Sequence, residues 1–265
     1  MTRDPFSFEG LTALVCGASR GIGRASAQML AARGARVVLV ARNVEALEAV
    51  RFGLAPVSAG AHIALSADAR DPADLGSRVR ACVERIGPLN ILVNNSGGPK
   101  AGPLLESPDE AFNAAFNQHI LAAQTLVKIL LPGMKESSHG RIVNVISTSV
   151  RVPIAGLGVS NTIRAARAGW AKTLAGEVGP YGVTVNNVLP GYTTTERFRE
   201  LVTAAAARGG KTETEIETVW RAAVPLGRFA TPEEVAGAIC YFASPAAAYV
   251  TGQSLAVDGG RIGAI

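Results

Sequence analysis

The sequence predicts an α/β fold, a doubly wound parallel sheet of about seven strands with helices on both faces. Short runs rich in β-branched residues alternate with longer alanine-rich stretches along the whole 265-residue chain. The short runs are apolar throughout, as strands covered by helices on both faces must be. Strands and helices that alternate in this way form right-handed βαβ units, which build a parallel sheet.

The elements follow one another without interruption. The predicted strands cover residues 12–16, 36–41, 62–67, 89–94, 140–146, 183–189 and 254–257. The predicted helices cover residues 22–33, 43–55, 72–86, 108–134, 156–178 and 231–243. Ser107 in "SPDEAF" and Thr231 in "TPEEVA" are suited to cap a helix N-terminus, with proline and acidic residues following. No linker, charge block or repeat breaks the pattern, which predicts a single domain over 1–265.

Composition excludes several classes of protein. The chain is 48% hydrophobic and 18% charged, which is typical of a globular domain. No apolar run approaches the roughly 18 residues of a membrane span, and the start "MTRDPFSFEG" lacks a signal-peptide core. We therefore expect a cytoplasmic protein that does not bind membranes. The three cysteines, Cys16, Cys82 and Cys240, form no CxxC pair and are expected to be buried free thiols.

The positive charge of the chain favours a small anionic ligand. The formal net charge is +5, but the arginines are scattered and aromatic residues make up only 5%. A nucleic-acid surface would instead show basic runs interleaved with aromatics, so no nucleic-acid partner is predicted. No HxxxH or HExxH pattern predicts a metal site, and no GxSxG pattern predicts a serine hydrolase.

The stretch "CGASRGIG", residues 16–23, lies between the first predicted strand and the first predicted helix. Gly17, Gly21 and Gly23 allow a tight turn, close approach of a diphosphate and close packing of helix on strand. Free N–H groups at the helix N-terminus then bind the phosphates. This placement predicts a dinucleotide site, although a glycine loop does not by itself select the nucleotide.

Two arginines bear on the choice of dinucleotide. The second strand ends in "VARN", without the carboxylate that would bind the ribose 2′-hydroxyl of NAD. Arg42 ends this strand and Arg20 lies inside the glycine loop, so both are expected to converge on a 2′-phosphate. The sequence therefore favours NADP(H) over NAD(H).

With these features the chain resembles the short-chain dehydrogenase/reductase family, and the 3-oxoacyl-carrier-protein reductases in particular. The motifs that carry the resemblance span nearly the whole length: "GASRGIG", "NNSGG" (94–98), "GRIVNVIS" (140–147), "VNNVLPGYTTT" (185–195), "PLGRFATPEEVA" (225–236) and "TGQSLAVDGG" (251–260). The resemblance implies a Rossmann-type fold, reduction of a small-molecule carbonyl or acyl-thioester substrate, and a homodimer or homotetramer.

The resemblance also implies positions around the cofactor. Asp68 and Ala69 would border the adenine, Asn94 would steady the sheet, and Pro190 with Gly191 would face the nicotinamide side. The expected cofactor-binding residues are Gly17, Ser19, Arg20, Gly21, Ile22, Gly23, Arg42, Asp68, Ala69, Asn94, Ser96, Gly97, Pro190, Gly191, Thr193 and Thr195.

The catalytic tetrad of that family (Asn, Ser, Tyr, Lys) is altered in this chain. Ser147 fits the serine position, Ser160 stands at the tyrosine, and Arg164 stands at the lysine one helical turn later. Counting back from "LLPGM" puts His119 at the asparagine, or Asn117 if the helix is irregular. No tyrosine lies between residues 98 and 181, so a shift of one turn does not restore one.

These replacements change the chemistry expected at each position. A serine hydroxyl is shorter and far less acidic than a phenol, so Ser160 is either a poor substitute or a helix-start residue with no chemical task. Arg164 keeps the positive charge and can bond the nicotinamide ribose, but it does not titrate. His119 can supply or relay a proton, or is a packed bystander. Tyr192 offers a second phenol, or covers the cofactor.

Two functions fit the sequence. The first is an NADP(H)-dependent oxidoreductase in which Ser147 orients a ketone or 3-oxoacyl carbonyl and His119, Tyr192 or water delivers the proton. The second is a nucleotide-binding or oligomer-forming protein without catalysis. A substrate lid is predicted at about 192–224, where the polar stretch "TAAAARGGKTETE" is expected to be mobile until something binds.

Overall fold

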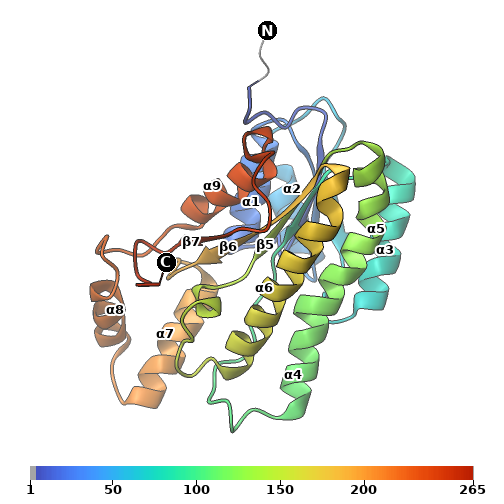
Figure 1. The fold of residues 1–265 in the computed structure, drawn as a ribbon. Helices are drawn as coiled ribbons and strands as arrows, with labels where there is room; N and C mark the ends of the chain where they lie inside the picture. Colours follow the sequence, from blue (N-terminus) through green and yellow to red (C-terminus); the bar gives the residue numbers. More distant parts are fainter. Residues whose placement is uncertain (1–3, 265) are drawn as a thin grey trace.

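The computed structural model describes residues 4–264 and contains one parallel sheet in the order β3-β2-β1-β4-β5-β6-β7 (Figure 1). Every strand lies within two residues of its predicted range, and the doubly wound fold is confirmed. The strands are β1 Thr12–Cys16, β2 Arg36–Ala41, β3 Ile63–Ser66, β4 Ile91–Asn94, β5 Gly140–Val145, β6 Val183–Pro190 and β7 Ser254–Val257.

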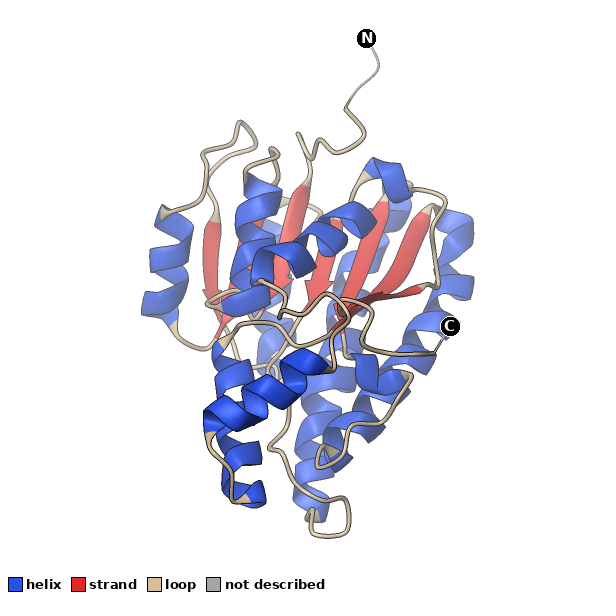
Figure 2. Ribbon diagram, turned by 90° about the vertical axis from the view of Figure 1, so that its left-hand side faces the viewer, coloured by secondary structure: helices blue, strands red, loops and turns tan. Residues whose placement is uncertain are grey.

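Helices cover both faces of the sheet, and each face has its own apolar core. Helices α1, α2 and α9 pack on one face, and α3, α5 and α6 pack on the other (Figure 1). Figure 2 shows the strands side by side between these helical layers. The helices are α1 Gly21–Ala31, α2 Val44–Phe52, α3 Pro72–Ile86, α4 Asp109–Phe116, α5 Ala122–Glu136, α6 Gly158–Val178, α7 Glu196–Gly209, α8 Glu213–Ala222 and α9 Pro232–Ala243.

The predicted helix over 108–134 is not continuous. It is divided into α4 and α5 by a π-helical turn, Asn117–Leu121. This wider turn adds one residue to the helix. Sequence periodicity does not detect such an insertion, because it assumes regular α-helical spacing. It leaves both His119 and Ile120 buried.

One of the two predicted helix caps is wrong and the other is confirmed. Helix α4 follows Pro108 without a side-chain cap, and the Ser107 hydroxyl donates instead to the carbonyl of Pro103 at 2.9 Å. Thr231 caps α9 in a capping box with Glu234.

The segment assigned to a lid contains two helices that sequence analysis missed, α7 and α8, and they lie away from the sheet (Figure 1). Thr195 caps α7 by accepting from the N–H of Phe198, and Thr212 forms a capping box with Glu215 at the start of α8. The T-x-x-E spacing at 212–215 was the available signal. The mobility of this segment stays a prediction.

The described residues include three free buried cysteines, Cys16, Cys82 and Cys240, as expected. No helix within 4–264 is long and apolar enough to cross a membrane. The same residues contain no cluster of metal-ligating side chains.

A row of polar side chains crosses four strands on the face covered by α3, α5 and α6. Asn94, Asn144, Asn187 and Ser254 are register neighbours on β4, β5, β6 and β7. Each amide donates to the next side chain, at 3.1, 3.0 and 3.0 Å. The bonds satisfy these largely buried groups and fix the register of the strands that hold the candidate site.

We predict that Asn144→Leu lowers the free energy of unfolding by at least about 2 kcal/mol, because it removes one hydrogen bond each from Asn94, Asn187 and the buried Arg167. Thr184→Val is the control, since the buried Thr184 hydroxyl on β6 has no hydrogen-bond partner. The control is expected to change stability by less than about 1 kcal/mol. Denaturant unfolding measures both, and equal costs would contradict the prediction.

Candidate functional site

A cavity of about 1040 Å³ lies at the carboxyl ends of β1, β2, β4, β5 and β6. Strands β1 and β4 are neighbours there, which is the switch point where doubly wound sheets bind ligands. The four predicted catalytic residues, Ser147, Arg164, His119 and Ser160, all line this cavity. All predicted cofactor-binding residues except Gly23 line it as well.

The glycine loop is shaped for close approach by a phosphate. Gly17 and Gly21 have φ angles of +61° and +54°, which side-chain-bearing residues rarely adopt. A Cβ at Gly23 would lie 2.2 Å from the carbonyl oxygen of Gly17, so this glycine supports packing of the helix on the loop. Helix α1 has no side-chain cap and no acidic residue in its first turn. Its N-terminal N–H groups therefore fit an anionic diphosphate.

The two arginines expected at the ribose phosphate have different surroundings. Arg20 forms an ion pair with Glu196, the first residue of α7, which links the glycine loop to the lid segment. Arg42 is exposed, lines the cavity and forms no ion pair within the described residues. Asp68 is paired with Arg70 at 2.6 Å, and this bond lowers the pKa of the Asp68 carboxyl. Convergence of Arg20 and Arg42 on one phosphate stays a prediction.

His119 is held at the π-helical turn as a neutral imidazole. Its Nδ1 is hydrogen-bonded to Ser96 Oγ at 2.9 Å, and its Nε2 is buried without a partner. Burial, followed by the charges of Arg164 and Arg167, lowers the pKa of His119 well below its usual value. At neutral pH the ring therefore carries no spare proton to act as a resting acid. Asn117, the alternative residue, does not line the cavity.

Arg164 is bonded to the chain that leads into Ser147. Its Nη1 donates to the carbonyl oxygens of Val145 and Ile146, both at 2.8 Å. Burial, followed by the charge of Arg197, lowers the pKa of Arg164 to about 10, so the guanidinium is still positive at pH 7. Ser147 Oγ accepts from the N–H of Ser149 at 3.0 Å. The hydroxyl hydrogen of Ser147 is therefore free to be donated elsewhere.

The two remaining candidates differ in how they are held. Ser160 lies in the first turn of α6, half-buried at the cavity wall. Tyr192 is stacked on Trp220 with ring centroids 4.7 Å apart, and the Arg261 guanidinium lies 4.4 Å from its ring. Burial raises the pKa of Tyr192. This packing favours the covering role weighed for Tyr192.

Sequence analysis missed Arg167, which reaches the site from α6. Its Nη2 donates to Asn144 Oδ1 at 2.7 Å, and its guanidinium lies 4.7 Å from the ring of Trp170. Burial, then the charge of Arg164, lowers the pKa of Arg167 to about 9. The available signal was its i+3 spacing from Arg164, which places both on one helix face.

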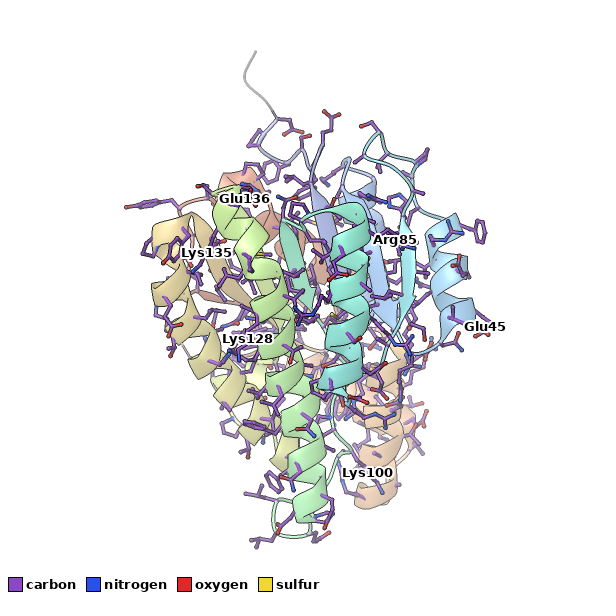
Figure 3. All side chains as sticks on the ribbon, turned by 90° about the vertical axis from the view of Figure 1, so that its right-hand side faces the viewer. Glu45, Arg85, Lys100, Lys128, Lys135 and Glu136 are labelled. Carbon is purple, nitrogen blue, oxygen red and sulfur yellow. The ribbon has the colours of Figure 1, made fainter. Side chains whose placement is uncertain are left out.

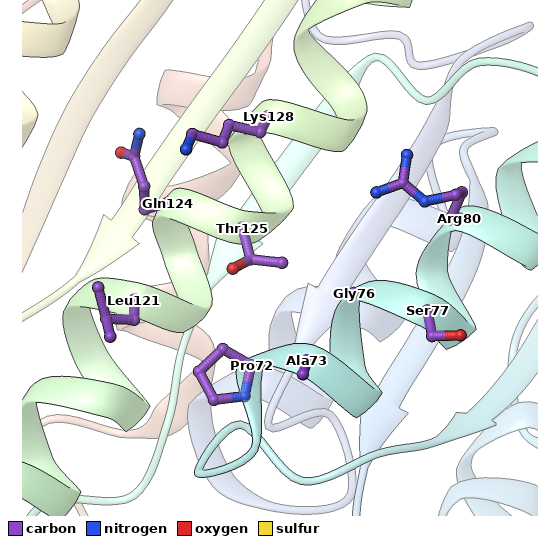
Figure 4. Close-up of a pocket in the computed structure, with 9 residues that line it drawn as sticks. All are labelled: Pro72, Ala73, Gly76, Ser77, Arg80, Leu121, Gln124, Thr125 and Lys128. Carbon is purple, nitrogen blue, oxygen red and sulfur yellow. The ribbon is translucent and has the colours of Figure 1, made fainter.

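A second hollow lies on the outer surface between α3 and α5 (Figure 4). A Cβ at Gly76 of α3 would lie 2.7 Å from Thr125 Cγ2 of α5, so α3 and α5 are in close contact beneath the hollow. Lys128 and Lys135 project from α5 on this side of the molecule (Figure 3). None of the predicted catalytic or cofactor-binding residues lines the hollow.

Comparison with known proteins places the chain among reductases. Residues 17–261 match the family described as enoyl-(acyl carrier protein) reductase. The chain is 35% identical to the 3-oxoacyl-[acyl-carrier-protein] reductase FabG of Escherichia coli K12 over 254 residues, covering 96% of this chain and 98% of FabG. FabG of Vibrio cholerae is 34% identical over 254 residues, with the same coverage.

Solved structures agree with this placement. L-sorbose reductase from Gluconobacter frateurii, solved with NADPH and L-sorbose, is 29% identical, with a TM-score of 0.89 over 99% of this chain and 100% of that chain. YwfH, an NADPH-dependent reductase involved in bacilysin biosynthesis, is 28% identical, with a TM-score of 0.90 over 96% of this chain and 99% of that chain. The chain belongs to the short-chain dehydrogenase/reductase family and resembles its 3-oxoacyl-carrier-protein reductases.

Proposed function

We propose that the protein is an NADP(H)-dependent reductase of a ketone or 3-oxoacyl-like carbonyl, in which Ser160 and Arg164 replace the usual tyrosine and lysine. The observation that carries this proposal is one continuous cavity that joins the glycine loop to Ser147. Its relatives support the proposal, since they include 3-oxoacyl-carrier-protein reductases and an L-sorbose reductase solved with NADPH.

The cofactor would be held by groups at the outer part of the cavity. The free N–H groups of α1 would bind the diphosphate, and Arg42 would bind the 2′-phosphate that distinguishes NADPH from NADH. The row that includes Asn94 would keep the neighbouring strand ends in place. When bound, NADPH supplies the hydride for the substrate carbonyl.

Ser147 and Arg164 would act together on the substrate oxygen. The Ser147 hydroxyl has its oxygen occupied by the Ser149 N–H, so its hydrogen can be donated to a carbonyl oxygen. Arg164 fixes the segment before Ser147 through two carbonyl bonds and adds a permanent positive charge nearby. Such a preorganised charge stabilises an oxygen that becomes negative during reduction.

The proton would come from water that enters the cavity. Cys16, His119 and Tyr192 line the cavity, and none of the three has a pKa suited to an acid at neutral pH. Burial raises the pKa of Cys16 to about 12 and also raises that of Tyr192, while His119 is neutral because burial lowers its pKa. Loss of a general acid typically slows a reaction by about 10²–10⁴-fold, so we expect slow turnover.

The missing phenol also favours a second function, a nucleotide-binding protein without turnover. Ser160 places only a short hydroxyl at the cavity wall. The expected homodimer or homotetramer stays a prediction under either function.

We predict that the protein binds NADPH at least about tenfold more tightly than NADH, and that Arg42→Ala removes this preference. A charged contact to a phosphate typically lowers a dissociation constant by about ten- to a hundredfold. Calorimetric titration measures both dissociation constants. Arg51→Ala, on α2 outside the cavity, is the matched control and is expected to keep the preference. Equal or tighter binding of NADH by the unaltered protein would defeat the assignment.

We predict slow NADPH oxidation with a panel of ketones and 3-oxoacyl thioesters, and a loss of about 10²-fold or more in kcat/KM for Ser147→Ala. Ser149→Ala is the control, because the Ser149 hydroxyl is buried without a partner and does not line the cavity. Nicotinamide absorbance follows the reaction. Tight NADPH binding without turnover on any substrate would instead support the non-catalytic function.

A further inference from the structure

The cavity carries the excess positive charge of the protein. Of the described residues, eight arginines and three carboxylates line it, which gives a net charge of +5. The whole chain has 26 basic and 21 acidic residues, also a net charge of +5. The remaining residues carry no formal net charge, and the cavity therefore attracts anions.

These charges occupy two parts of the cavity. Arg20 and Arg42 lie at the glycine loop and the end of β2, where the phosphates of a dinucleotide would bind under the proposed function. Arg164, Arg167 and Arg197 lie toward Ser147 and the segment that follows β4. The phosphates of a dinucleotide at the start of α1 account for none of this second group, and the proposed reduction gives a role to Arg164 alone.

Arg164 and Arg197 meet at Gly98. A Cβ built on Gly98 would lie 3.7 Å from Arg164 Nη2 and 3.5 Å from Arg197 Nη2. Arg164 comes from α6, while Arg197 comes from α7 of the lid segment and donates to the carbonyl of Pro99 at 2.5 Å. Two guanidinium groups thus approach one glycine from different elements, and all three residues line the cavity.

The protein supplies little negative charge to offset this pair. Within the described residues Arg164 and Arg167 form no ion pair, and the Nε of each is buried without a partner. Arg197 is paired only with Glu200, at 3.0 Å on the same half-exposed helix face. Arg164 is a buried cation without a counter-charge, which is costly, so an anion that binds between it and the partly exposed Arg197 is favoured.

We propose that Arg164 and Arg197 bind a carboxylate of the substrate, so that the substrate is an oxo-acid with a free carboxylate rather than a neutral ketone or thioester. The planar guanidinium fork matches a carboxylate, and two forks would clamp it from two elements. Arg164 is bonded to the two residues before Ser147, so an oxo group near the bound carboxylate would face the Ser147 hydroxyl. This inference rests on the proposed reductase function and narrows its substrate.

The test uses the full chain with NADPH and three probes, pyruvate, acetoacetate and levulinate, each beside its neutral methyl ester. NADPH oxidation gives kcat/KM, and calorimetry on the complex with NADP⁺ gives a binding constant that does not depend on turnover. We expect at least one acid to exceed its ester by about tenfold or more in both measurements. Arg197→Gln should bring that ratio close to one, and Arg197→Lys should restore part of it.

Arg208→Gln is the matched control, because it removes the same charge from the far end of α7, outside the cavity. It should keep the preference, and all variants should bind NADPH within about twofold of the unaltered protein, which also reports their folding. The inference is overturned if the protein binds NADPH but treats acids and esters alike, binds none of the acids, or keeps its preference in Arg197→Gln. Failure to bind NADPH would instead count against the proposed function.

Discussion

The site depends on two buried arginines that are held at the end of the central sheet. Arg164 is fixed by carbonyl oxygens at the end of β5, and Arg167 by the Asn144 side chain on the same strand. Asn144 also joins the row of side chains that crosses β4 to β7. These bonds link three features of the site: the positions of the two α6 guanidinium groups, the register of β4 to β7, and the position of Ser147. A change at any one of them is therefore felt at the others.

This arrangement separates binding from proton transfer. An arginine in place of lysine keeps a charge that persists at neutral pH, and it is bonded to the segment that carries Ser147. Under the proposed function, the Ser160 hydroxyl is too weak an acid to donate the proton, and the buried His119 offers none at rest. Under the same proposal, the arginines attract and orient anionic ligands, whereas the absence of a phenol at Ser160 limits the rate. The net positive charge of the cavity, which favours the binding of anions, agrees with this division.

Much of the fold could be predicted because its signals are local. Apolar β-branched runs predicted all seven strands, and the position of the glycines predicted the loop before α1. The π-helical turn at His119 escaped prediction because periodicity assumes regular spacing. Helices α7 and α8 were missed because the polar, glycine-containing stretch that joins them resembles a loop, although Phe198, Val202 and Ala206 recur at i, i+4 spacing in α7 and Thr212 with Glu215 marks the start of α8. The candidate site residues were predicted one by one from the spacing of the family motifs. Arg167 was missed because its hydrogen-bond partner, Asn144, is distant in sequence.

A crystal structure of the protein grown with NADPH tests the proposed cofactor site. We expect the diphosphate at the N-terminus of α1, the 2′-phosphate at Arg42, and the nicotinamide ring in the inner cavity beside Ser147, with Arg164 still bonded to β5. A dinucleotide bound elsewhere on the molecule, or a cavity that stays closed to the diphosphate in the presence of saturating NADPH, would contradict it.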